Sequence, residues 1–207
     1  MKRNIYIIRH SSPFVEIDQS DKIPFEEQNR NMILSVSAEK KAEKVSGMSK
    51  FKNIRSVYSS NSPRAIATAK YFADINHGKI KVNNLLNERH FGIIYLEELP
   101  NDFVIKQFED KNYKLKNGES LNEVKIRLKQ FINNVLVQEK EENIVIILHG
   151  ICFMCFLDLY CNVSYDGKNF KVIHDGKMIF NKMIKPLEMF KLELDDDKLL
   201  KISNIIY

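Results

Sequence analysis

The stretch Asn-Ile-Tyr-Ile-Ile-Arg-His at residues 4–10 decides the fold and marks a candidate site. Its first five residues are largely apolar and predict a buried β-strand, which stops at Arg9 and His10. A second apolar run at 144–148 stops in the same way at His149. Ligands of open α/β sheets bind outside the carboxyl ends of the strands, so we expect these polar residues to converge on one pocket.

Apolar strands alternate with amphipathic helices along the chain, which is typical of an α/β sheet. Two helices have clear start signals: Ser62 and Pro63 suit an N-cap and a first helical position, and Ser120 pairs with Glu123 in a capping box. We expect helices at 37–49, from 63 to a stop at Gly78, at 120–138 and over the segment after Gly150. Further strands are expected at 56–60, 188–194 and 199–204. The predicted fold is a three-layer α/β fold, with a mostly parallel central sheet flanked by helices and an antiparallel hairpin at the sheet edge.

The 207 residues suffice for one domain spanning 1–207, and no repeat or linker marks a boundary. Two segments, 11–34 and 93–117, are expected to be elaborations that cover the substrate. The apolar runs are too short for a signal peptide or a membrane span. We therefore expect a cytoplasmic protein that does not bind membranes.

Cysteine and charge content narrow the function classes. The three cysteines lie in one apolar segment, which indicates small buried residues rather than a disulfide framework or a zinc site. The net charge of +5 is spread over many lysines and favours a phosphorylated or carboxylated small molecule. No arginine-rich stripe is present, so nucleic acid is not an expected partner. The oligomeric state is left open.

Histidine and arginine at strand ends suit phosphoryl transfer. A neutral imidazole can attack phosphorus, and arginine binds the charged oxygens of the transferring group in a bidentate manner. Arg9 and Arg64 are the obvious pair. Arg64 falls in the first turn of a predicted helix, where a cation is unfavourable unless an anion compensates it. A second histidine can add a hydrogen bond, and a carboxylic acid is needed to protonate the leaving oxygen.

Five motifs in order resemble the histidine phosphatase, or phosphoglycerate mutase-like, superfamily. They are a strand followed by Arg9-His10-Ser11, Ser59-Ser60 followed by Arg64 and Ala-x-x-Thr-Ala, Leu-Asn-Glu-Arg-His-Phe-Gly at 86–92, Gly-Glu-Ser at 118–120, and His149-Gly150. Each motif is weak alone, but together they cover roughly residues 4–152 in the right order.

The resemblance implies a phosphoric monoester hydrolase that acts on a small phosphorylated metabolite without a metal ion or cofactor. It implies that His10 is the nucleophile and that Glu88 donates the proton. It also implies that the phosphate is bound by Arg9, Arg64 and His149, the last being catalytic as well. Further candidates for contact with the substrate are Ser11, Glu16, Arg89 and Gly150.

Departures from the family pattern favour a phosphatase over a mutase. Ser11 replaces a glycine, Glu16 stands where mutases carry an asparagine, and Leu148 stands where a serine often precedes the late histidine. The segment 93–117 lacks the paired arginines of the mutase branch. A phosphoglycerate mutase remains an alternative because of residues 86–92, and a catalytically idle phosphate-binding or interaction module remains another.

Each candidate residue also has a simpler interpretation. His10 and His149 could be core histidines, and Glu88 could belong to a solvated turn. His77 and His90 are expected at a helix end or in a loop, and the string His174-Asp175-Gly176 predicts a turn. The lysines of 93–117 could form a lid or a solvated face.

Overall fold

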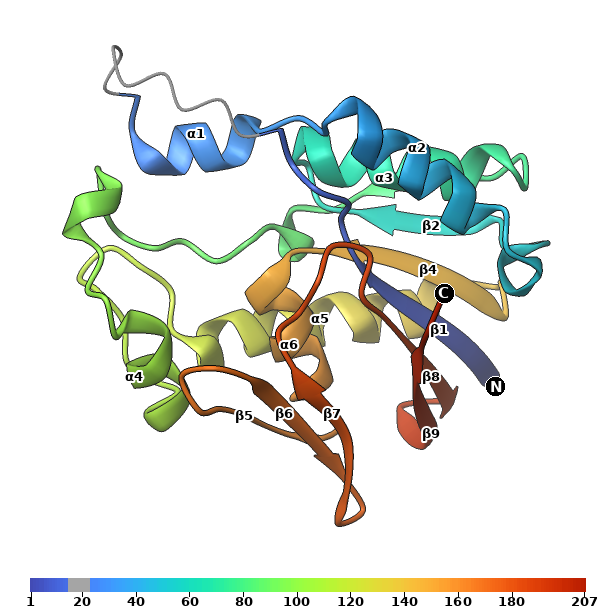
Figure 1. The fold of residues 1–207 in the computed structure, drawn as a ribbon. Coiled ribbons are helices and arrows are strands. Elements are labelled where there is room, and N and C mark those ends of the chain that lie inside the picture. Colours follow the sequence, from blue (N-terminus) through green and yellow to red (C-terminus); the bar gives the residue numbers. More distant parts are fainter. Residues whose placement is uncertain (15–22) are drawn as a thin grey trace.

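The computed structural model describes residues 1–14 and 23–207, which form two β-sheets and their covering helices (Figure 1). The larger sheet has the strand order β3-β2-β4-β1-β8-β9. These strands are β1 (Lys2–Arg9), β2 (Ser56–Ser59), β3 (Lys79–Val82), β4 (Asn143–Leu148), β8 (Met189–Asp195) and β9 (Lys198–Ile205). The four strands from β3 to β1 are parallel, whereas β8 and β9 form an antiparallel hairpin with β9 at the edge. The predicted sheet and edge hairpin are confirmed.

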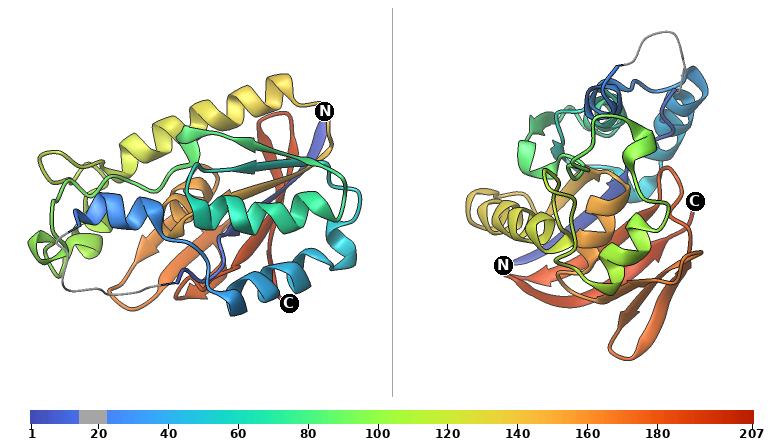
Figure 2. Two further views of the ribbon diagram at one scale, coloured as in Figure 1. Left: turned by 90° about the horizontal axis from the view of Figure 1, so that it is seen from above. Right: turned by 90° about the vertical axis from the view of Figure 1, so that its left-hand side faces the viewer.

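Helices cover both faces of this sheet (Figures 1 and 2). Alternate residues of β1 and β4 point to opposite faces, as the period of a strand requires. One set packs with α2 (Val36–Ser46) and α3 (Pro63–Asp74). The other set packs with α5 (Leu121–Gln138) and α6 (Gly150–Leu157). The result is the three-layer arrangement that the sequence predicts.

Helix ends follow the predicted signals only in part. Ser120 and Glu123 form the capping box of α5. Pro63 opens α3, but the expected side-chain cap is wrong, because the Ser62 hydroxyl donates to the Arg30 carbonyl. The left-handed residue after α3 is His77, with φ of 52°. The chain thus leaves α3 earlier than the predicted stop at Gly78.

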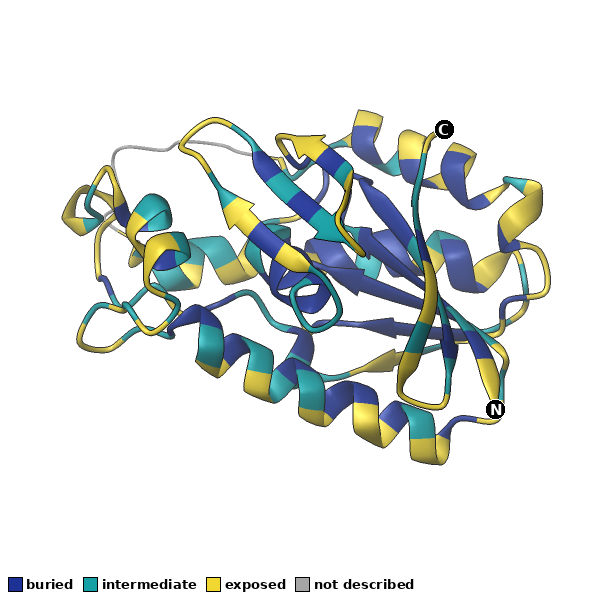
Figure 3. Cartoon of the chain, turned by 90° about the horizontal axis from the view of Figure 1, so that it is seen from below, coloured by how far each residue is buried: buried dark blue, intermediate teal, exposed yellow. Residues whose placement is uncertain are grey.

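A second, antiparallel sheet was not predicted. It contains β5 (Asn162–Tyr165), β6 (Phe170–His174) and β7 (Lys177–Lys182). Phe170 and Phe180 bury their rings in the same core cluster as α5 and α6. Figure 3 shows that this sheet mixes buried residues with intermediate and exposed ones, whereas β4 of the large sheet is buried from Ile144 to Leu148. The turn between β6 and β7 contains Asp175 and Gly176 at positive φ, which confirms the turn predicted there.

Two short helices lie in the segments expected to cover the substrate. These are α1 (Phe25–Asn31) and α4 (Phe103–Glu109). Single 3₁₀ turns occur at η1 (Ser49–Phe51), η2 (Asn84–Leu86) and η3 (Leu96–Glu98). Both α1 and α4 stand beyond the carboxyl ends of the parallel strands (Figure 1). Within the described ranges, no helix is both long enough and apolar enough to cross a bilayer.

Candidate active site

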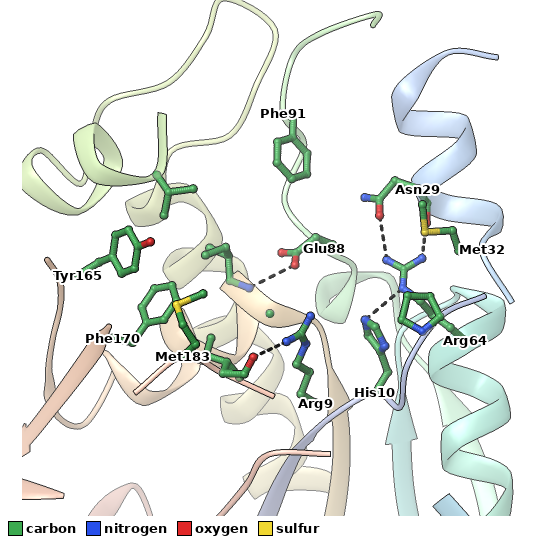
Figure 4. A pocket seen from close by; sticks show the side chains of 15 residues that line it. Arg9, His10, Asn29, Met32, Arg64, Glu88, Phe91, Tyr165, Phe170 and Met183 are labelled. Carbon is green, nitrogen blue, oxygen red and sulfur yellow. Dashed lines mark hydrogen bonds between the residues drawn. The ribbon is translucent and has the colours of Figure 1, made fainter. Parts of the chain in front are cut away.

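The carboxyl ends of the parallel strands bring the predicted residues together (Figure 4). His10 follows β1, His149 follows β4, and Glu88 lies shortly after η2, which follows β3. The backbone N–H of His10 donates to the carbonyl of Leu148 at 2.9 Å, so the two histidine-bearing ends are joined directly. A cavity of about 340 Å³ opens at this edge of the sheet.

His10 is held as a neutral imidazole with one defined tautomer. The residue is 4% exposed, and Nδ1 lies 2.7 Å from the backbone carbonyl of Ser11. Nδ1 must therefore carry the proton, because a carbonyl can only accept. Nε2 keeps its lone pair and accepts a hydrogen bond from Nε of Arg64 at 3.1 Å. Burial, with the nearby His149 and Arg64, lowers the pKa of His10 well below its usual value of 6.5.

Arg64 lies in the first turn of α3 and connects both histidines to α1. Its Nη2 contacts His149 Nδ1 at 3.0 Å and Asn29 Oδ1 at 3.2 Å, and its Nη1 donates to the carbonyl of Asn29. Burial lowers the pKa of Arg64 from its usual value, but a guanidinium remains charged at neutral pH. Two neutral carbonyl oxygens of Asn29 thus occupy the donors of a buried cation.

His149 is also neutral, and both of its ring nitrogens have partners. Nδ1 accepts from Arg64, so the proton resides on Nε2, which donates to the Ser60 hydroxyl at 2.7 Å. The ring is 5.0 Å from that of His10, centroid to centroid. Burial and the neighbouring charge of Arg64 lower the pKa of His149 well below 6.5.

Arg9 also lines the cavity, beside His10 (Figure 4). Its Nη1 donates to the carbonyl of Ile184 at 2.6 Å. Its Nε is buried and has no partner among the residues that the structure describes. Gly150 lies between Arg9 and Glu88, and a Cβ at this position would come 3.9 Å from a Glu88 carboxylate oxygen. A side chain at position 150 would therefore contact both Arg9 and Glu88.

Glu88 is fixed against the first turn of α6. Its carboxylate accepts backbone N–H groups from Arg89 at 2.9 Å, Ile151 at 3.2 Å and Cys152 at 3.3 Å. Burial acts to raise the pKa of Glu88, but the charge of Arg89 and the backbone hydrogen bonds outweigh it, so the pKa lies below the usual 4.5. Glu88 is therefore an ionised, positioned carboxylate rather than part of a solvated turn.

Ser11 does not present its hydroxyl to the cavity. The residue is fully buried, and the hydroxyl donates to the carbonyl of Ala38 in α2 at 2.9 Å, while its backbone N–H donates to the hydroxyl of Thr68. The structure corrects the expectation that this hydroxyl contacts the substrate. Glu16, the other departure near His10, lies outside the described residues.

Arg89 is buried beside the site instead of lining the main cavity. Its guanidinium lies over the rings of Phe91 and Phe103, at 4.5 and 5.4 Å from their centroids. It borders a neighbouring cavity of about 260 Å³, together with the exposed His90. His77 and His174 lie away from both cavities.

Asn29 and Ser60 are site residues that the sequence analysis did not assign a role. Ser60 belongs to the recognised Ser59-Ser60 motif, so that motif could have indicated its hydrogen bond to His149. No sequence signal marks Asn29, since α1 has no buried face. In the described part of the chain, no three His, Cys, Asp or Glu side chains are grouped as metal ligands.

The sequence comparison agrees with this geometry. Residues 5–176 match the profile of the histidine phosphatase superfamily, branch 1. The chain belongs to the histidine phosphatase superfamily. No curated protein has a sequence that matches this one.

Solved structures with the same fold include both phosphatases and a mutase. The mycobacterial glucosyl-3-phosphoglycerate phosphatase aligns over 100% of this chain and 99% of its own, with a TM-score of 0.69 and 15% identity. Phosphoglycerate mutase from Bacillus anthracis aligns over 99% and 92%, with a TM-score of 0.68 and 15% identity. A putative alpha-ribazole-5'-P phosphatase from Escherichia coli aligns over 89% and 98%, with a TM-score of 0.59 and 16% identity. At these identities, the likeness establishes the phosphoglycerate mutase-like fold and not a substrate.

Proposed function

We propose that this histidine phosphatase hydrolyses a small phosphomonoester through a phosphohistidine on His10, without a metal ion. The observation that carries the proposal is the state of His10. Its Nδ1–H is held by the Ser11 carbonyl, and the lone pair of its neutral Nε2 accepts a hydrogen bond from Arg64, which must be released when Nε2 attacks phosphorus. A buried neutral imidazole that is held in this tautomer can act as a nucleophile through Nε2.

In the first step, His10 Nε2 attacks phosphorus and the bond from phosphorus to the ester oxygen breaks. The alcohol oxygen takes a proton from Glu88, and the phosphoryl group remains on Nε2. Arg9 and Arg64 stabilise the negative charge on the phosphoryl oxygens, because both are buried cations at the cavity wall. His149 holds Arg64 in place through its Nδ1.

In the second step, water attacks phosphorus and the bond to Nε2 breaks. Glu88, now a carboxylate, takes the proton from the attacking water, and His10 returns to its neutral form. Inorganic phosphate then leaves. Over both steps Glu88 gives one proton and recovers one, as general acid–base catalysis requires.

The lowered pKa of Glu88 is suited to the second step and must rise for the first. A dianionic phosphate beside a carboxylate raises the pKa of that carboxylate, because two like charges repel. The bound ester therefore supplies the shift that the free protein lacks. The hydrogen bonds between Arg64 and Asn29 must also break when the ester binds, because phosphate oxygens compete for the same guanidinium donors.

The test is phosphate release from p-nitrophenyl phosphate and a panel of alkyl phosphomonoesters, with EDTA present. We expect turnover by the wild type and none by His10→Ala. His174→Ala is the matched control, because His174 lies in β6 away from the cavity and its loss should leave turnover unchanged. Turnover by His10→Ala would refute the nucleophile assignment.

The same experiment separates the alternatives. Interconversion of phosphoglycerates with retention of a bisphosphorylated primer, without net phosphate release, would favour a mutase. Binding of phosphate or vanadate with no turnover of any ester would favour an idle binding module.

A further inference from the structure

We propose that the outer part of the active-site cavity binds an apolar, aromatic leaving group, so that the preferred substrates are phosphomonoesters whose alcohol carries a ring and no second anion. The proposal rests on the proposed function, which places the phosphate on His10 and the two arginines. It goes beyond that function by naming the class of substrate.

The cavity has a charged end and an apolar end (Figure 4). Arg9, His10, Arg64 and Glu88 lie at the charged end. The apolar end is formed by side chains from separate parts of the chain: the segment after Glu88, α4, and the small sheet with the residues that follow it. These side chains are Phe91, Val104, Tyr165, Phe170, Met183 and Ile184.

Aromatic rings are held in fixed positions around this end. Tyr165 and Phe170 lie together with ring centroids 4.5 Å apart. The Tyr165 hydroxyl donates to the carbonyl of Gly167 at 2.9 Å, so the polar tip of this side chain already has a partner. Phe91 is held by an edge-to-face contact with Phe25, with centroids 5.0 Å apart. Rings fixed in this way offer preorganised apolar surface to a ligand.

Charged groups are scarce along the same walls. Among the described residues that line the cavity, the permanent cations are Arg9 and Arg64. The proposed function assigns both of them to the phosphoryl oxygens. A carboxylate or a second phosphate on the alcohol would therefore lose water without gaining a positive partner, which is unfavourable. An aromatic ring would lose only its apolar hydration, which is favourable.

The experiment compares three alkyl esters with similar chemistry at the leaving oxygen: 2-phenylethyl phosphate, ethyl phosphate and 3-phosphoglycerate. We expect kcat/KM for 2-phenylethyl phosphate to exceed that for ethyl phosphate by about tenfold or more, from burial of the ring. We expect 3-phosphoglycerate to fall below ethyl phosphate. Equal values for the phenylethyl and ethyl esters would overturn the proposal.

A pair of matched variants locates the effect. Met183 is 49% exposed at the cavity rim, and Met178 is 51% exposed on β7 away from the cavity. Met183→Lys should reduce the preference for the phenylethyl ester and improve 3-phosphoglycerate. Met178→Lys adds the same charge and should change neither. Equal responses of the two variants would contradict the assignment of this wall.

Phosphonates keep this test separate from the proposed function, because their carbon–phosphorus bond is not hydrolysed. We expect calorimetry to give tighter binding of benzylphosphonate than of methylphosphonate by about tenfold. If this preference is seen but no ester is hydrolysed, the proposed function fails and the apolar site stands. If esters are hydrolysed but both phosphonates bind equally, the apolar site fails and the proposed function stands.

Discussion

Replacing Glu88 with glutamine removes the proposed proton donor with almost no change in shape. The amide oxygen of the variant can still accept hydrogen bonds from the backbone N–H groups of Arg89 and Cys152. The amide nitrogen cannot accept from the N–H of Ile151, which in the wild type donates to a carboxylate oxygen at 3.2 Å. One of three backbone hydrogen bonds is lost. We expect a loss of about 1 kcal/mol in the free energy of unfolding, and a folded protein.

The effect on catalysis should depend on the leaving group. An alkoxide is a poor leaving group and needs a proton, so Glu88→Gln should lower kcat for 2-phenylethyl phosphate by about 10² to 10⁴-fold. Nitrophenolate is a stable anion that leaves without protonation. Formation of the phosphohistidine from p-nitrophenyl phosphate should therefore slow by less than about tenfold, although its later hydrolysis also uses Glu88.

Rapid mixing separates these steps. A burst of nitrophenolate equal to the enzyme concentration, followed by slow turnover, is expected for Glu88→Gln, because the first step stays fast and the second needs the missing base. Thermal unfolding of the same preparation checks that the variant is folded. Loss of the burst and an equal fall in kcat for both esters would refute the assignment of Glu88 as acid and base.

Three further outcomes follow from the same geometry. The pKa values of His10 and His149 are lowered in the folded protein, so the unfolded chain binds more protons below pH 6.5. The free energy of unfolding should therefore fall as the pH decreases below 6.5, by up to about 1.4 kcal/mol per pH unit for each histidine. Melting curves between pH 7.5 and 5 should show a shallower decline for His149→Asn, and equal slopes would contradict this. Phe153 is fully buried, and Phe153→Ala should cost about 3–5 kcal/mol in chemical unfolding, whereas less than 1 kcal/mol would show that its site collapses. Asn29→Asp places a carboxylate on Arg64 and should weaken phosphate binding by about tenfold or more in calorimetry, and unchanged affinity would show that α1 does not compete for Arg64.

The site could be predicted from sequence because strand ends are encoded locally. The apolar runs of β1 and β4 are buried on both faces, and each is followed at once by a histidine. Parallel pairing then brings the two ends together: Arg9 is opposite Leu148 in the register, so His10 and His149 are neighbours. Leu148 is the last residue of β4 and is fully buried, so it cannot contact a substrate.

Other features depend on tertiary contacts that leave no periodic pattern. Helix α1 has only seven residues and no buried face, so nothing in its sequence separates it from a loop. Strand β5 has four residues, and its burial comes from packing against other elements. The direction of the Ser11 hydroxyl is decided by a carbonyl of α2, 27 residues away. Helix α1 and strand β5 both contribute residues to the wall of the cavity, so specificity is harder to predict than chemistry.

The most direct test of the central claim is to trap the covalent intermediate. The protein is mixed with p-nitrophenyl phosphate, quenched in alkali within milliseconds, digested and examined by mass spectrometry under conditions that preserve phosphohistidine. We predict a phosphoryl group on the peptide that contains His10, with none in His10→Ala. Phosphate release from the wild type with no phosphoryl group on His10 at any time, including in Glu88→Gln, would contradict the account.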